Sequence, residues 1–299
     1  MESSELFPIF AKKYMMDYNL IRKSLVSSPE KIVEIEKFYF KFFLNNIKDK
    51  YLDIKKDFND ASLLEDFWKK YAPRQRGRGP RNEAYPWGEV GEKVLDAYIY
   101  KIVTEKIPSV RFTGLPYGHD TRFTTENAFV QLDIKSTGPN DNLDELVSSP
   151  NQVSGDGKYL DDEGVFNSEV LVRGPLRTLN FQPELPPFYV IDGVPKLTLT
   201  YYLKCVYEVI EKGNQPLSYL ELICVPNGLL MFDTFNYNMK KTGLLIPGKD
   251  IQTSEHKRTR IRLYPLSEIA PWRCVKLYEK DGEIICQQRI VRTGTDLFL

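Results

Sequence analysis

Apolar and aromatic side chains recur at helical spacing through the first part of the chain. Over residues 32–43 they fall three or four positions apart, which places them on one face of a helix. Ser28 precedes this run as a cap residue, with Pro29 at the first helical position and Glu30 in the first turn. Residues 1–71 are therefore expected to be helical, with aromatic stripes that pack in the core or at a subunit interface.

The pattern changes after a segment rich in proline, glycine and arginine. A short helix is expected to begin at Ser62, residues 72–85 are predicted to form a loop, and the next helix is predicted to begin near Trp87. After residue 108, β-branched and apolar runs favour strands. The predicted strands cover 110–112, 128–134, 188–191, 197–202, 220–225 and 258–264, with a helix at 202–212 and a hairpin within 276–290 around Lys280-Asp281-Gly282.

Helices followed by a mixed β-sheet predict one α/β domain over residues 1–299. Within it, residues 1–71 form a helical N-terminal part and residues 86–265 form the core that carries the chemistry.

The charge of the chain gives no indication of its partner, because 41 basic residues balance 41 acidic ones. The distribution of charge is more informative. Basic residues gather in RQRGRGPR at 74–81, in the Lys240-Lys241 pair and in HKRTRIR at 256–262. A neutral protein can present a basic cleft of this kind to nucleic acid, and an ordinary solvated surface explains each run equally well.

The cysteines and the N-terminus limit the class of protein. The 4 cysteines form no C-x-x-C pair and the chain has 2 histidines, so reduced cysteines of an intracellular protein are expected rather than a zinc site. The first residues lack the apolar core of a signal peptide, and no apolar run is long enough to span a bilayer. The protein is expected in the cytoplasm.

Two acidic residues and a lysine carry the candidate chemistry. Asp133 and Lys135 end an apolar strand and, being two residues apart, project from the same face. Asp120 follows a glycine- and proline-containing turn, and a hairpin would bring it beside Asp133. Paired carboxylates suit Mg²⁺, and a neighbouring lysine can orient a water or stabilise a phosphorane-like charge. Alone, the pattern Asp…Asp-x-Lys also fits a surface ion pair.

A helix offers a third carboxylate. Glu89 and Glu92 lie three residues apart in PWGEVGEK, and Glu92 is the candidate to reach the metal site. An exposed helical ion pair, such as Glu89 with Lys93, is the alternative and is favoured for Glu89.

The strand expected at 258–264 alternates charged and apolar residues. Arg258, Arg260 and Arg262 would project from one face, while Ile261 and Leu263 face the core. Aligned arginines on a strand can enter the major groove and pair with guanine, although an ordinary solvated strand has the same pattern.

Specific runs extend these observations into a family resemblance. The chain resembles the type II restriction endonucleases of the PD-(D/E)xK nuclease superfamily over most of its length up to about residue 265. The runs that carry the resemblance are DFNDASLLEDFW (57–68), PWGEVGEK (86–93), GLPYGHDTRF (114–123), DIKSTGPND (133–141), SPNQVSGDG (149–157), VPNGL (225–229), PGKD (247–250) and RTRIR (258–262).

The resemblance implies a restriction-endonuclease-like fold, a homodimer, and Mg²⁺-dependent cleavage of an interrupted palindrome that contains G·C pairs. It gives Asp120 and Asp133 the metal-ligand role, Lys135 the catalytic lysine role, and Glu92 a place near the active site. It gives Lys249, Arg260 and Arg262 roles in base reading. Asp141 corresponds to another DNA-facing position.

Three features depart from the family pattern. The segment between Asp120 and Asp133 is shorter, which trims a hairpin and leaves the metal site intact. Ile251 stands where an acidic base-reading residue is expected, which changes the recognition site. The last thirty or so residues have no clear counterpart.

The sequence therefore predicts a type II restriction endonuclease that hydrolyses phosphodiester bonds in double-stranded DNA to 5′-phosphate and 3′-hydroxyl ends. A cognate DNA methyltransferase is expected as its genetic partner. A structure-specific nuclease, such as a repair enzyme or junction resolvase, and an inactive DNA-binding protein of the same fold remain alternatives. The arginine strand favours sequence reading, and the intact Asp120, Asp133 and Lys135 favour catalysis.

Overall fold

A computed structural model describes nine stretches of the chain. They cover residues 17–62, 87–112, 120–155, 170–173, 178–191, 193–210, 215–233, 243–248 and 258–289. The predicted loop at 72–85, and Lys249 and Ile251, lie outside these residues.

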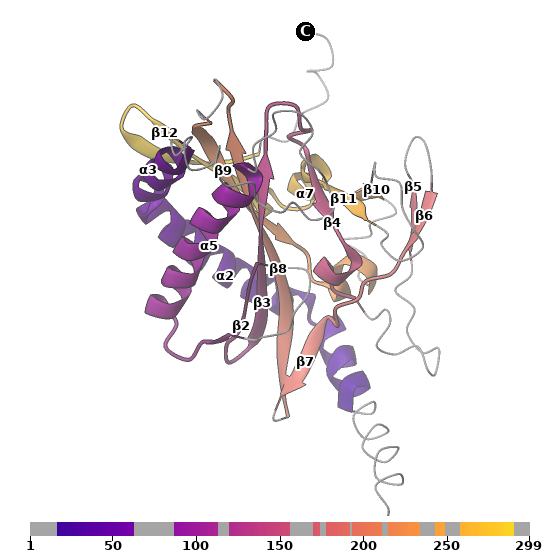
Figure 1. The fold of residues 1–299 in the computed structure, drawn as a ribbon. Coiled ribbons are helices and arrows are strands. Elements are labelled where there is room, and N and C mark those ends of the chain that lie inside the picture. The colour runs from indigo at the N-terminus through magenta and orange to yellow at the C-terminus, as the bar shows by residue number, and fades with distance from the viewer. Residues whose placement is uncertain are drawn as a thin grey trace, which may run out of the picture.

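Helices cover one side of the protein (Figure 1). Residues 17–26 are helical, and α2 (Pro29–Asp49), α3 (Tyr51–Ser62) and α5 (Trp87–Lys106) follow. The predicted start at Pro29 is confirmed, and the residues from Trp87 onward are helical, as predicted. The Ser28 side chain makes no capping bond, and the short helix predicted to begin at Ser62 lies, beyond that residue, outside the described residues.

The centre of the fold is an eight-stranded mixed sheet. Its main path is β1-β2-β3-β8-β9-β12-β13, and β7 also pairs with β8. All of its strand pairs are antiparallel except β3 with β8, which run parallel from Ala128 opposite Leu197 to Thr137 opposite Val206. The strands are β1 (Arg111–Phe112), β2 (Thr121–Thr124), β3 (Ala128–Thr137), β7 (Phe188–Ile191), β8 (Val194–Tyr207), β9 (Leu217–Val225), β12 (Cys274–Lys280) and β13 (Glu283–Gln288).

The prediction of a helix at 202–212 is wrong over residues 202–210. Tyr202 to Tyr207 continue β8, which bonds to β3 on one side and β9 on the other. A central strand buried on both faces is largely apolar, and such a run cannot be distinguished from a buried helix by periodicity.

The hairpin predicted around Lys280-Asp281-Gly282 is confirmed. It joins β12 to β13 through Asp281 and Gly282, which have φ values of 53° and 81°. Positive φ at both positions is typical of a type I′ turn, for which Asp-Gly is a favoured pair.

The two faces of the central sheet pack against different partners. One face of β8 and β9, including Tyr201, Leu203 and Leu222, joins the cluster formed with α2, α3 and α5. The opposite face, including Tyr202 and Ile223, joins a second cluster. The side chains of β3 alternate in the same way, so Gln131, Asp133 and Lys135 lie on the face away from the helices.

A smaller sheet lies over that second face (Figure 1). Its order is β10-β11-β4, formed by β10 (Leu245–Pro247), β11 (Thr259–Arg262) and β4 (Glu145–Ser148). Helix α7 (Leu263–Ile269) follows β11 directly, and its Leu263 and Leu266 are fully buried. A two-stranded sheet of β5 (Val170–Arg173) and β6 (Thr178–Phe181) adds Val172 and Phe181 to the same cluster. Short helical turns occur at η1 (Pro150–Gln152), η3 (Leu229–Asp233) and η5 (Pro271–Arg273).

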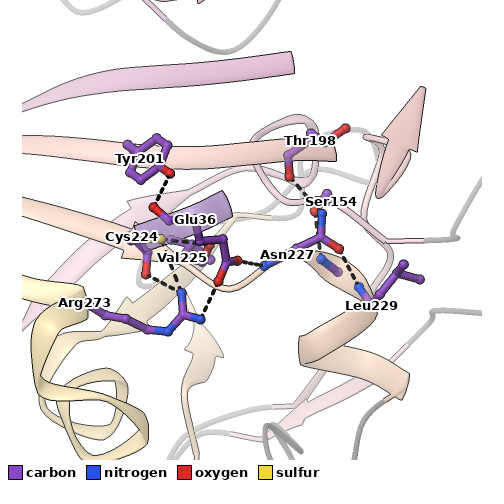
Figure 2. A network of polar contacts seen from close by, with 10 residues as sticks. Glu36, Ser154, Thr198, Tyr201, Cys224, Val225, Asn227, Leu229 and Arg273 are labelled. Carbon is purple, nitrogen blue, oxygen red and sulfur yellow. Dashed lines mark hydrogen bonds and ion pairs between the residues drawn. The ribbon is translucent and has the colours of Figure 1, made fainter. Parts of the chain in front are cut away.

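A buried polar network joins α2 to the ends of the central strands (Figure 2). Glu36 and Arg273 form an ion pair with 2.5 Å between Oε2 and Nη2, and both side chains are almost fully buried. The second Glu36 oxygen accepts the backbone N–H of Asn227 at 2.6 Å. The Asn227 side chain in turn donates to the carbonyls of Pro187 and Thr198. The network therefore fixes the turn after β9.

Among the described helices, none combines the length and apolar character that a membrane crossing requires.

Candidate active site

The candidate site is built around the end of β3. Asp133 lies on the face of β3 opposite Leu132 and Ile134, which belong to the helix-side cluster. Its side chain is 6% exposed, and Lys135 Nζ lies 2.5 Å from Asp133 Oδ2. Lys135 also lies over the ring of Tyr202, 5.9 Å from its centroid. The predicted side-by-side placement of Asp133 and Lys135 is thus present in the structure.

Asp120 approaches from the neighbouring strand. It immediately precedes β2, which pairs antiparallel with β3. Its Oδ2 accepts the backbone N–H of Ile134 at 2.7 Å, so its carboxylate lies beside the peptide that follows Asp133. The β2–β3 hairpin therefore brings the two predicted carboxylates together, as the sequence spacing indicated.

Glu92 reaches the same strand end from α5. Its Oε1 accepts the backbone N–H and the hydroxyl of Ser136, both at 3.3 Å. One turn later on the helix, Asp96 accepts the Thr121 hydroxyl at 2.7 Å, which fixes α5 against β2. Glu92 is thus turned toward the site.

Burial and like charge shape the electrostatics of the site. Burial raises the pKa of the Asp133 carboxyl to about 7, with the Lys135 ammonium opposing this effect and the Asp120 carboxylate adding to it. Burial also raises the pKa of Glu92; the Ser136 N–H lowers it, and Asp120 raises it further. Negative charge is therefore concentrated where a cation would relieve it.

Gln152 is part of the site, and the sequence analysis assigned it no role. It ends η1, and its Nε2 donates to Asp133 Oδ1 at 2.9 Å. Its Oε1 accepts the backbone N–H of Ser149 at 3.0 Å. The Ser-Pro-Asn-Gln run at 149–152 has the spacing of a capping box, which is the local signal for the Ser149 contact. No local signal points to the contact with Asp133.

The donor set fits a hard divalent cation. Carboxylate oxygens are the ligands that Mg²⁺ prefers, and Mg²⁺ is commonly held by one or two carboxylates with the rest of its shell made of water and phosphate. Asp120 and Asp133 supply such a pair. Over the part of the chain that the structure describes, no group of three or more His, Cys, Asp or Glu side chains forms an enclosing metal cage.

The arginines of β11 alternate with buried residues. Thr259 and Ile261 are fully buried, whereas Arg258 is exposed and Arg260 and Arg262 are partly exposed. The predicted alternation is therefore confirmed, although Leu263 belongs to α7 rather than to the strand.

The arginine strand lies directly beside acidic residues. Arg260 Nη1 lies 3.2 Å from Glu145 Oε2 on β4, with side-chain exposures of 17% and 12%. Burial raises the pKa of Asp144, and the positive charges of Arg289 and, to a lesser extent, Arg262 oppose the rise.

Asp141 lies in the exposed loop after β3, where its Oδ2 accepts the Gly138 N–H at 2.9 Å.

A cluster of buried charged residues contacts the same loop at Leu143. Lys204 Nζ and Arg289 Nη2 both donate to the Leu143 carbonyl, at 2.6 Å and 2.8 Å. Arg289 also contacts both carboxylate oxygens of Glu221, at 2.5 Å and 3.0 Å.

Comparison with known proteins agrees with this geometry. A family model described as "Restriction endonuclease BglI" matches residues 12–277. The chain is 33% identical to the type II restriction enzyme BglI of Bacillus subtilis over 290 residues, which is 89% of this chain and 97% of that protein.

Solved structures give the same relationship. The crystal structure of the restriction endonuclease BglI bound to its DNA recognition sequence matches with a TM-score of 0.78 and 32% identity, over 89% of this chain and 97% of that one. The tetrameric restriction endonuclease SfiI bound to cognate DNA matches with a TM-score of 0.52 and 12% identity, over 82% of this chain and 97% of that one. The second match concerns the fold alone.

Proposed function

Since this chain belongs to the restriction endonuclease BglI family, we propose that it hydrolyses phosphodiester bonds of double-stranded DNA at a specific site, using Mg²⁺. The observation that carries the proposal is the convergence of Asp120, Asp133 and Lys135 at the end of β3. The intact set favours an active enzyme over a protein of this fold that only binds DNA.

In this proposal each side chain at the end of β3 has a separate task. Asp120 and Asp133 hold Mg²⁺, which when bound supplies positive charge to neutralise the phosphate and to acidify water. Lys135 orients the attacking water and stabilises the charge that develops on the phosphate. Glu92 holds Ser136 at the end of the strand and adds negative charge close to Asp120. Cleavage leaves 5′-phosphate and 3′-hydroxyl ends.

We assign the contact with DNA to the arginine strand and the segments around it. Arg260 and Arg262 lie on β11, the middle strand of the small sheet, and Arg258 directly precedes it; all three can donate to guanine acceptors in the major groove. Asp141 faces the DNA from the loop after β3, and Lys249 and Ile251 complete the set from outside the described residues. The expected site is an interrupted palindrome that retains a G·C pair or two in each half.

A palindrome has two-fold symmetry, so a symmetric homodimer is the assembly that reads it. A cognate methyltransferase, encoded nearby, would protect the host DNA, and both enzymes would act in the cytoplasm.

Residues 1–299 are proposed to form one domain, because β8 and β9 contribute to both hydrophobic clusters.

The test is cleavage of defined DNA by wild type and by Asp133→Ala. Wild type should cut with Mg²⁺ or Mn²⁺, and should bind without cutting in Ca²⁺. Asp133→Ala should abolish cutting and leave specific binding measurable. Lys135→Ala should behave similarly. Asp53→Ala, at an exposed position on α3, is the control and should cut normally. Appreciable cutting by Asp133→Ala would refute the site assignment.

A further inference from the structure

The two hydrogen bonds of the Gln152 side chain fix the orientation of its amide. Oε1 can only accept, and it faces the backbone N–H of Ser149 at 3.0 Å. The amide nitrogen must then point the other way, toward Asp133 Oδ1, which lies 2.9 Å from it. Asp133 is therefore contacted on both oxygens, by Gln152 on Oδ1 and by Lys135 on Oδ2.

The backbone that carries Gln152 is held on its N-terminal side by the arginine strand. Strand β4 ends one residue before Ser149, and it pairs with β11 from Glu145 opposite Arg262 to Ser148 opposite Thr259. The hydroxyl groups of Ser148 and Tyr202 share a hydrogen bond of 2.8 Å. Tyr202 is the residue whose ring lies under Lys135.

The same segment is held on its C-terminal side by the turn after β9. The Gly228 N–H donates to Ser154 Oγ at 2.9 Å, and the Gly155 N–H donates to the Leu185 carbonyl at 2.8 Å. Gly228 packs so closely that a Cβ there would lie 2.2 Å from the Ser154 carbonyl oxygen. Figure 2 shows Asn227 and Ser154 together at this junction with the Glu36–Arg273 network.

We infer that Gln152 is a positioning residue for cleavage: it holds the Asp133 carboxylate in the orientation that binds the metal. The inference rests on the proposed function. Without the amide, Asp133 Oδ1 loses the hydrogen bond from Gln152 while Lys135 stays on Oδ2, so the carboxylate is free to follow Lys135. Outer partners of metal-binding carboxylates commonly change metal affinity or activity by about 10- to 100-fold.

The position of Gln152 also relates the metal site to the DNA-facing strand. The segment from Glu145 to Gln152 runs without interruption from the partner of Arg260 to the partner of Asp133. The arginine strand and the Asp133 carboxylate are therefore linked by a short backbone segment that is hydrogen-bonded to both.

The experiment compares wild type, Gln152→Met and Ser154→Ala. Gln152→Met keeps the length of the side chain and removes both polar contacts. Ser154→Ala is the matched control, because it removes a hydrogen bond from the same segment without touching Asp133. Binding of Mn²⁺ to the full chain without DNA is measured by electron paramagnetic resonance, and cleavage is then measured as a function of Mg²⁺ concentration.

Gln152→Met is expected to weaken Mn²⁺ binding and raise the half-saturating Mg²⁺ concentration by about 10- to 100-fold. DNA binding in Ca²⁺-free buffer and the thermal midpoint should stay near those of wild type, and Ser154→Ala should leave Mn²⁺ affinity unchanged. If Gln152→Met does not fold, Gln152→Asn carries the test, because its amide is one methylene too short to reach Asp133.

Unchanged Mn²⁺ affinity in the folded Gln152 variant, or an equal loss in Ser154→Ala, would overturn the inference. The proposed function fails separately, if wild type cuts no DNA with Mg²⁺ or Mn²⁺. In that event the Mn²⁺ measurement without DNA still decides the role of Gln152.

Discussion

At the scale of single residues, Lys204 is the most unusual side chain of the central sheet. It is fully buried, and burial lowers its pKa from 10.5 to about 8, with the Glu221 carboxylate opposing this effect. Its ammonium donates to the Leu143 carbonyl, so it holds the loop that carries Asp141. A buried lysine of this kind makes stability depend on pH.

Lys204→Met should remove that dependence. Between pH 8 and pH 10.5 the unfolded chain keeps a proton that the folded protein has lost, so the wild-type free energy of unfolding rises with pH through this range. Relative to the variant, wild type should gain about 2–3 kcal/mol from pH 8 to pH 10.5. Urea unfolding at both pH values measures it. A constant difference between the two proteins would contradict the depressed pKa.

Arg260 gives a second prediction for a single residue. If it reads a guanine, Arg260→Ala should reduce discrimination at one base pair of each half-site by about 1–3 kcal/mol. A phosphate contact would instead weaken binding to all sequences alike. Cleavage of a randomised DNA library separates these results. Uniform loss across the library would remove Arg260 from the base-reading set.

At the scale of elements, α2 is locked to the sheet by charge as well as by apolar packing. Its Glu36 is buried, and burial raises the pKa of that carboxyl while Arg273 from η5 opposes the rise. A buried pair of this kind adds little net stability over an apolar pair, but removing one partner leaves an uncompensated charge.

Arg273→Met should therefore destabilise the protein by about 3–5 kcal/mol. The double variant Glu36→Leu/Arg273→Met should be less destabilised than Arg273→Met, because no charge remains buried alone. Urea unfolding of the three proteins at one pH gives the comparison. A single variant as stable as the double one would mean that the pair is not buried in solution.

At the scale of the whole molecule, the end of β3 that carries the candidate site and the arginine strand β11 belong to the same proposed domain. β3 carries Asp133 and Lys135, and β4, which bonds to β11, follows it after a short loop. In the proposed function, a short loop thus joins the strand that carries the cleavage residues to the strand that pairs with the arginines.

Light scattering should give the mass of a symmetric dimer for the protein bound to DNA, because a palindrome presents two equal half-sites. The aromatic residues of the N-terminal helices pack largely into the core cluster, although Phe38 on α2 remains 65% exposed. A monomer both free and on DNA would exclude reading by two-fold symmetry.

Residue order alone predicts the parts of the site that are close along the chain. Asp120, Asp133 and Lys135 were found because one hairpin brings them together, and a strand places residues two apart on one face. The alternation around Arg260 and the Asp281-Gly282 turn were equally local. Contacts between residues close in the chain follow from the regular geometry of strands and turns, so a sequence pattern can predict them.

The remaining features depend on contacts between segments that are distant in the chain. The apolar run after Tyr202 is compatible with a helix, and the bonds to β3 and β9 make it a strand. Gln152 meets Asp133 only because β4 turns back across the end of the central sheet, and Glu36 meets Arg273 across 237 residues of chain. These contacts depend on how separate elements pack, and packing between distant segments is set by the summed burial of many side chains rather than by any local pattern.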